Sequence, residues 1–296
     1  MKDTILYGDC RQTLDTLKSQ ITIGICDKPR MCVTSPPYYG LRDYGGENSQ
    51  IGLEQTPEEY IQEMVKVLAK VKDCLADDGT LWLNIGDSYY NYRPGKGQGL
   101  VKQTVSNSKQ DLPDKCARRG NKLKGYKEKD LIGIPWMLAF ALRADGWYLR
   151  QDIIWHKPNP MPESVRDRCT KSHEYVFLLS KNQNYYFDVD AIKEPTRRKR
   201  SVWNVQTKPY RGSHFAVYPP ELIEPCILAG SEEGDIVLDP FMGSGTTAMV
   251  AKSLGRHYMG CELHEDYGNL IQKRIGESEP VNEVSQEPTI NILDII

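Results

Sequence analysis

The sequence predicts an α/β fold in which a mostly parallel, twisted sheet carries helices on both faces. Strand-like apolar runs alternate with segments of helical period along most of the 296 residues, which is typical of such sheets. Hydrophobic residues at 39% and charged residues at 26% are ordinary for a soluble globular protein. No run approaches the ~20 apolar residues of a membrane span, so no membrane partner is expected.

The clearest helix signal follows Thr56. Thr56 is the expected N-cap, Pro57 occupies the first helical position, and Glu59 completes a capping box. The helix is expected to end near Gly79.

The other elements follow from period and from bounding Gly and Pro residues. A strand is expected at 30–34, and the run at 235–240 is expected to be a central strand of the sheet. Further strands are predicted at 80–87, 147–157, 174–180 and 256–263, and further helices at 131–146, 219–230, 245–255 and 264–276.

Two prolines end the first of these strands in the stretch TSPPYY, residues 34–39. Pro36 and Pro37 fix φ and donate no ladder hydrogen bond, so they hold Ser35 and Tyr38 at a strand end. Ligands of open α/β sheets bind beyond the carboxyl ends of strands. The stretch is therefore a candidate site, although on these residues alone a rigid turn is the simpler interpretation.

A second motif, DPFMGSGTT at 239–247, follows a strand and opens a helix. Gly243, Gly245 and Ala248 have the spacing of a nucleotide-binding loop. Glu262 lies about 20 residues downstream, where a carboxylate can bind a ribose hydroxyl. The arrangement predicts a nucleoside site.

The residues around this loop restrict the nucleoside. Asp239 at the loop entrance disfavours a pyrophosphate and favours a ligand with positive charge. No Gly-Lys-Ser/Thr follows, which excludes a P-loop, and Met242 stands where a nucleophile elbow needs its first glycine.

The net charge of -2 hides an uneven distribution. Segment 91–130 holds eleven basic and four acidic residues, segment 190–211 holds seven and two, and the tail 277–296 holds five acids and no base. Two basic segments indicate a polyanion partner, with solvated loops as the alternative. We expect a catalytic domain at 1–276 with the basic segments 91–130 and 190–213 inserted, followed by the acidic tail.

Eight cysteines without a Cys-x-x-Cys pair indicate reduced thiols rather than disulfides. His257, Cys261 and His264 have a metal-like spacing but no evident fourth ligand, so no metal is predicted. The start MKDTILYGDC lacks an apolar signal region, and cytoplasmic residence is the expectation.

With both motifs present, the sequence resembles the beta class of S-adenosylmethionine-dependent DNA amino-methyltransferases. In that family a Ser-Pro-Pro-Tyr catalytic motif precedes the glycine-loop cofactor motif, in a circularly permuted, Rossmann-like methyltransferase fold. The resemblance covers about residues 4–275. It also includes YGDC at 7–10, DIIWHKPNPMPES at 152–164, HEYVFLLSK at 173–181 and HFAVYPPELIEPCI at 214–227.

The resemblance implies a set of cofactor residues. Glu262 would bind the ribose of S-adenosylmethionine, Asp9 would lie near its adenine, and Phe215 would help close its methionine side. Asp9 is also a candidate helix N-cap. The pocket itself would be lined by the loop residues Asp239, Pro240, Phe241, Gly243, Gly245 and Thr246.

The resemblance also implies how the amino group of a base is methylated. The Ser35 hydroxyl oxygen and the Pro36 carbonyl, held by Pro37, would accept its N–H bonds, and Tyr38 would stack on the flipped base. In the family a serine at this position usually accompanies cytosine N4 methylation and an aspartate accompanies adenine N6 methylation. Cytosine N4 is therefore the expected target, with adenine N6 as the alternative.

Other classes remain open at this point. An NAD-dependent oxidoreductase would explain the glycine loop, and an inactive DNA-binding protein would explain the basic segments. The expected partner is double-stranded DNA, and the family allows a cognate restriction endonuclease as a second partner. The inserted segments 91–130 and 190–213 are the candidate DNA-recognition regions. The candidate DNA contacts within them are Lys122, Lys124, Lys127, Arg197, Arg198, Lys199 and Arg200.

Overall fold

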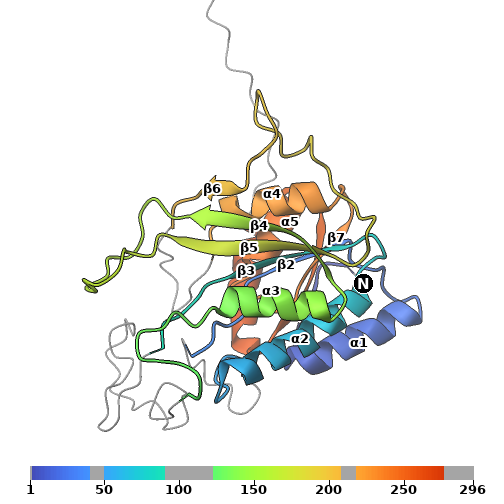
Figure 1. The fold of residues 1–296 in the computed structure, drawn as a ribbon. Coiled ribbons are helices and arrows are strands. Elements are labelled where there is room, and N and C mark those ends of the chain that lie inside the picture. Colours follow the sequence, from blue (N-terminus) through green and yellow to red (C-terminus); the bar gives the residue numbers. More distant parts are fainter. Residues whose placement is uncertain (1, 41–49, 91–122, 208–217, 277–296) are drawn as a thin grey trace, which may run out of the picture.

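An eight-stranded sheet in the order β1-β8-β7-β2-β3-β5-β4-β6 organises the computed structural model, which describes residues 2–40, 50–90, 123–207 and 218–276 (Figure 1). Only β5 runs antiparallel to its neighbours within this sheet. The strands are β1 (Thr4–Tyr7), β2 (Met31–Thr34), β3 (Thr80–Ile85), β4 (Tyr148–His156), β5 (His173–Ser180), β6 (Val202–Asn204), β7 (Ile236–Asp239) and β8 (His257–Glu262).

Helices cover both faces of the sheet, as the sequence predicts. α1, α2 and α3 lie on one face, and α4 and α5 lie on the other (Figure 1). The bounds are α1 (Cys10–Thr22), α2 (Pro57–Cys74), α3 (Ile134–Ala144), α4 (Pro220–Gly230), α5 (Thr246–Ser253) and α6 (Gly268–Gly276), with a short 3-10 turn, η2, at Glu265–Tyr267. None of the described helices is long and apolar enough to cross a membrane.

Two apolar cores form because successive residues of a strand point to opposite faces. In β2, Cys32 packs into the core that contains Leu68 of α2. Met31 and Val33 pack into the other core, which contains Ile227 of α4. The strand is buried at every position, which explains why it reads as a continuous apolar run.

The predicted start of α2 is confirmed in detail. The Thr56 hydroxyl accepts the backbone N–H of Glu59, and the Glu59 carboxylate accepts the backbone N–H of Thr56. The predicted end near Gly79 is wrong, because α2 stops at Cys74. The chain then turns, with the Ala76 N–H donating to the Pro29 carbonyl and the Gly79 N–H to the Ala76 carbonyl.

The sequence analysis did not predict two of the strands, β1 and β6, because both are short and are stabilised by pairing with neighbouring strands. β1 pairs with β8 in parallel, with Tyr7 opposite Glu262. β6 is three residues long and pairs with the end of β4, where His156 lies opposite Asn204. A strand this short gains its stability from pairing rather than from its own pattern.

The carboxyl ends of the parallel strands meet along one edge of the sheet. β1, β8, β7, β2 and β3 end there side by side. Both predicted motifs begin at this edge, one after β2 and one after β7, which is where the topology of open α/β sheets places ligands.

Candidate active site

A hydrogen bond joins the two motifs across neighbouring strands. The Thr34 hydroxyl, at the end of β2, donates to Asp239 Oδ1, at the end of β7, over 2.6 Å. Ser35 follows Thr34 and the glycine loop follows Asp239. Segments 205 residues apart in the chain therefore lie next to each other at the candidate site.

Asp239 is the centre of a buried polar cluster, with 1% of its surface exposed. Besides Thr34, its carboxylate accepts the Thr247 hydroxyl (2.5 Å), the Tyr218 hydroxyl (3.2 Å) and the backbone N–H of Phe241 (2.9 Å). Burial raises the pKa of Asp239, and these hydrogen bonds oppose the rise. Asp239 thus fixes the start of the glycine loop, and its effect on a cationic ligand stays a prediction.

The two loop glycines differ in what a side chain would meet. Both have positive φ, +54° at Gly243 and +82° at Gly245. A Cβ at Gly245 would lie 2.8 Å from Cγ2 of Ile271 in α6, whereas the nearest atom of the described residues to a Cβ at Gly243 is the Phe241 carbonyl oxygen, at 3.9 Å. Gly245 is therefore required by helix packing, and Gly243 leaves an open side on the loop.

The rest of the loop is tied to its surroundings. Pro240 is buried, and the Met242 N–H donates to the Cys261 carbonyl in β8 over 2.9 Å. Arg274 of α6 donates to the Thr246 hydroxyl over 2.8 Å and also contacts Ser244. These contacts hold the loop in one conformation at the sheet edge.

Glu262 ends β8 directly beside the loop. Its carboxylate accepts the backbone N–H groups of Gly243 (2.8 Å) and His264 (3.0 Å). Burial raises the pKa of Glu262 to about 7, despite these hydrogen bonds. Nε2 of His264 is buried with no hydrogen-bond partner among the described residues, so this corner can satisfy further polar groups of a ligand.

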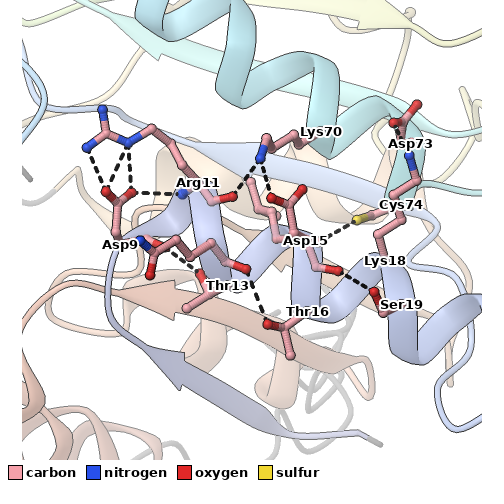
Figure 2. Close-up of polar contacts among 12 residues, drawn as sticks. Asp9, Arg11, Thr13, Asp15, Thr16, Lys18, Ser19, Lys70, Asp73 and Cys74 are labelled. Carbon is pink, nitrogen blue, oxygen red and sulfur yellow. Dashed lines mark hydrogen bonds and ion pairs between the residues drawn. The ribbon is translucent and has the colours of Figure 1, made fainter.

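Asp9 lies at the end of the next strand, β1, where the Gly8 N–H donates to the Glu262 carbonyl. Its carboxylate caps α1 through the Arg11 N–H and pairs with the Arg11 guanidinium (Figure 2). The same guanidinium pairs with Glu63 of α2. Burial alone would raise the pKa of Asp9, but the hydrogen bonds from Arg11 outweigh it and the pKa is lowered. The N-cap interpretation is confirmed, and contact with an adenine stays a prediction.

A hydrogen bond from α2 fixes the diproline segment. The Tyr60 hydroxyl donates to the Pro37 carbonyl over 2.9 Å. Within the described part of the chain no group donates to the Pro36 carbonyl. The Ser35 hydroxyl lies 3.5 Å from the Tyr38 hydroxyl. Donors from the described residues thus do not saturate the two groups that are predicted to accept from a target amine.

Tyr38 is anchored through its hydroxyl. That hydroxyl donates to Glu174 Oε2 in β5 over 2.7 Å and lies 3.3 Å from Asn84 Oδ1 in β3. A Cβ at Gly86 would lie 2.6 Å from Cε2 of Tyr38, so the glycine makes room for the ring. The segments that contain Asn84 and Glu174 were identified in the sequence, but no sequence pattern predicted that these two residues contact Tyr38.

The predicted DNA contacts fall into two places. Lys124 and Lys127 are exposed on the segment that returns to the end of β3, where Tyr89 pairs with Leu131. Residues 197–200 precede β6. The last residue of β6, Asn204, lies opposite His156 at the edge of the sheet where the parallel strands end. In this run Arg197 pairs with Glu194, and the Lys199 ammonium lies 5.2 Å from the Trp203 ring centroid.

Some predicted sites lie outside the described residues. These are Lys122 and Phe215, with most of segment 91–130, residues 208–213 and the tail 277–296. Among the described residues no group of three His, Cys, Asp or Glu side chains could hold a metal ion.

The chain matches the family model of a DNA methylase over residues 30–273. It is 48% identical over 283 residues to the type II methyltransferase M.SmaI of Serratia marcescens, covering 92% of this chain and 90% of that protein. It is also 48% identical over 277 residues to M.XycI of Xanthomonas campestris pv. cyanopsidis, with 92% and 87% covered. The chain belongs to the DNA methylase family.

Solved structures agree with this placement at the level of the fold. The PvuII cytosine-N4-specific DNA methyltransferase is similar with a TM-score of 0.65 at 18% identity, covering 98% of this chain and 89% of that chain. A putative DNA modification methylase of Thermus thermophilus, in complex with S-adenosylmethionine, gives 0.60 at 22% identity, with 94% and 95% covered. The predicted Rossmann-like methyltransferase fold is confirmed.

Membership of the family settles the broad class of the protein. It is a DNA methyltransferase that uses S-adenosylmethionine, which replaces the alternatives of an NAD-dependent oxidoreductase and an inactive DNA-binding protein. The site suits this cofactor, because the open side of Gly243 and the Glu262 carboxylate stand together at the sheet edge.

Proposed function

We propose that the protein methylates the N4 amino group of cytosine in double-stranded DNA. The observation that supports this most directly is Ser35. The Thr34–Asp239 hydrogen bond holds it beside the glycine loop, together with a Pro36 carbonyl that accepts no hydrogen bond from the described residues. In the resembling family a serine here usually accompanies cytosine N4 methylation. Adenine N6 remains the alternative, because the same two acceptors serve either base.

The mechanism follows from what an exocyclic amine needs. Its lone pair is delocalised into the ring, and two acceptors on its N–H bonds make the nitrogen more nucleophilic. The Ser35 hydroxyl oxygen and the Pro36 carbonyl supply them. S-adenosylmethionine supplies a methyl group on a positively charged sulfur. Positioning and electrostatics carry such a step, so no nucleophilic side chain is needed.

The cofactor residues follow from the same edge. We propose that Glu262 binds the ribose and that Asp9 and Phe215 contact the adenine and methionine ends. Stacking of the flipped base on the ring of Tyr38 recovers part of the ~few kcal/mol that flipping costs. The remaining lining residues are proposed to be Asp239, Pro240, Phe241, Gly243, Gly245 and Thr246.

The target base can be tested with the purified protein. Duplex DNA is incubated with S-adenosylmethionine carrying a labelled methyl group, digested to nucleosides and resolved by chromatography. We expect the label to co-elute with N4-methylcytosine. Label in N6-methyladenine would assign the alternative base, and no label in either nucleoside would reject amino methylation.

Binding of S-adenosylmethionine is expected to depend on pH through Glu262. Its pKa is raised to about 7, so below pH 7 the free protein carries a protonated carboxyl that has lost one acceptor for the ribose. Calorimetry should therefore show affinity falling by up to about tenfold per pH unit below 7 and constant above it. Glu262→Gln should bind more weakly at pH 8 and show no such slope; a slope retained in this variant would argue against Glu262.

Segments 91–130 and 190–213 are proposed to hold the DNA, in part through phosphate contacts. Lys124→Gln and Lys127→Gln should each flatten the dependence of log affinity on log salt by about 0.9 for every phosphate that is no longer neutralised. The same approach extends to Lys122 and to residues 197–200. Lys18→Gln is the matched control and should leave the slope unchanged. It removes an exposed ion pair between Lys18 of α1 and Asp73 of α2.

We propose that a cognate restriction endonuclease acts alongside this protein, since the relatives at 48% identity are named type II methyltransferases. Methylation by this chain would protect the sites that such an enzyme cleaves.

A further inference from the structure

A line of hydrogen bonds leads from Ser35 across the sheet. The Ser35 hydroxyl lies 3.5 Å from the Tyr38 hydroxyl, which donates to Glu174 Oε2 over 2.7 Å. The first distance is long for a hydrogen bond, as is common at catalytic sites before substrate binds. Both hydrogen bonds have the same direction: the Ser35 hydroxyl donates to the Tyr38 hydroxyl, and the Tyr38 hydroxyl donates to the Glu174 carboxylate.

Neighbouring strands hold Glu174 in place. It precedes Tyr175, which pairs with Ile85 at the end of β3. The ammonium of Lys157, the residue that follows β4, pairs with Glu174 Oε1, and Asn84 Nδ2 donates to Oε2 over 3.3 Å. A carboxylate with this many partners is oriented rather than free to rotate.

Stacking of a base on Tyr38 does not explain this arrangement. A phenylalanine would offer the same ring face, yet the Tyr38 hydroxyl is buried against a carboxylate. Burial and the charge of Glu174 raise the pKa of Tyr38 well above its usual value, so the hydroxyl keeps its proton and remains a donor.

We infer that Glu174 is a positioning residue that orients the Ser35 hydroxyl through Tyr38 and receives the proton lost by the methylated amine. This inference rests on the proposed function. With its hydrogen directed to Tyr38, the Ser35 oxygen turns its lone pairs toward the amine. The role deepens that of Ser35, whose hydroxyl has the Tyr38 hydroxyl as its partner within the described ranges.

Atoms and charges balance in this transfer. The amino nitrogen lone pair forms the N–C bond, and the C–S bond breaks with its electron pair left on sulfur. The nitrogen, now positively charged, gives one proton to the Ser35 oxygen. The Ser35 hydrogen passes to Tyr38, and the Tyr38 hydrogen passes to Glu174, which becomes a neutral carboxylic acid.

Two conservative variants test the relay. Tyr38→Phe removes the hydroxyl and keeps the ring, and Glu174→Gln removes the charge and keeps the shape. Single-turnover rates at saturating DNA and S-adenosylmethionine should fall about 10- to 100-fold in each. The double variant should lose no more than either single one, because both break the same line.

Binding measurements separate this loss from a structural one. Affinities for S-adenosylmethionine and for DNA with 2-aminopurine at the target should stay within twofold of the wild type, and so should the 2-aminopurine fluorescence. Tyr185→Phe, which removes an exposed contact with Arg150, is the matched control and should change neither rate nor binding.

The pH profile gives the decisive readout. The titratable and charged groups around Glu174 are Tyr38, Lys157, Lys171 and His173. We expect an acidic limb in the pH–rate profile of the wild type and no such limb in the profile of Glu174→Gln. A limb that persists in this variant would assign the titration to another group, such as His173, and would overturn the relay.

A wild-type rate in Tyr38→Phe would likewise overturn the relay. This variant removes one buried oxygen atom, and its melting temperature shows whether it still folds. If Tyr38→Phe does not fold, Glu174→Gln decides alone by its rate and pH profile. A wild type that methylates no amino group would reject the proposed function rather than the relay.

Discussion

Replacing Ser35 by alanine is expected to slow methyl transfer by about 2–4 kcal/mol of transition-state stabilisation, comparable to the loss of one oxyanion-hole donor. The change removes one of two acceptors on the reacting amine. Single-turnover kinetics measures the effect directly. Affinity for S-adenosylmethionine should not change, because the described hydrogen bond of the Ser35 hydroxyl is to Tyr38 and not to the glycine loop.

Ser19→Ala provides the control for this experiment. The Ser19 hydroxyl donates to the Asp15 carbonyl on the exposed side of α1 (Figure 2). This variant should react at the wild-type rate. A Ser35→Ala protein that also did so would remove Ser35 from the chemistry.

Gly243→Ala is expected to abolish most of the affinity for S-adenosylmethionine while the protein stays folded. Among the residues that the structure describes, no atom lies closer than 3.9 Å to the new methyl group, so it would occupy the open side of the loop that we assign to the cofactor. The positive φ adds strain of about 1 kcal/mol. Calorimetry should show at least about a tenfold loss of affinity, or 1.4 kcal/mol.

Gly234→Ala separates backbone strain from occupation of the pocket. Gly234 has φ of +81°, and a Cβ there meets no atom of the described part of the chain within 4 Å. It should lower the melting temperature about as much as Gly243→Ala and leave cofactor binding intact. Gly245→Ala should instead destabilise the fold through Ile271. Equal cofactor affinity in Gly243→Ala and the wild type would place the cofactor elsewhere.

Much of the fold could be predicted because its signals are local. The capping box at Thr56 and the apolar runs of β2 and β7 depend on a few neighbouring residues. The direction of β5 and the existence of β1 and β6 depend on which strands lie alongside, and no local pattern carries that information.

The site divides in the same way. Both loops could be located from proline and glycine spacing, which act on the backbone where they stand. The contacts of Asp239 with Thr34 and Tyr218, and of Tyr38 with Glu174, join residues far apart in the chain. Such pairs become visible only when the strand order is known. Asp239 was therefore interpreted from its sequence neighbours alone, and its hydroxyl partners were missed.

Nucleoside mass spectrometry of host DNA tests the central claim most directly. The chain and its Ser35→Ala variant are expressed in a host without N4-methylcytosine, and the genomic DNA is digested completely. We predict N4-methylcytosine in the first sample and a greatly reduced amount in the second. N6-methyladenine as the new nucleoside, or no new methylated nucleoside with the folded wild-type protein, would contradict cytosine N4 methylation.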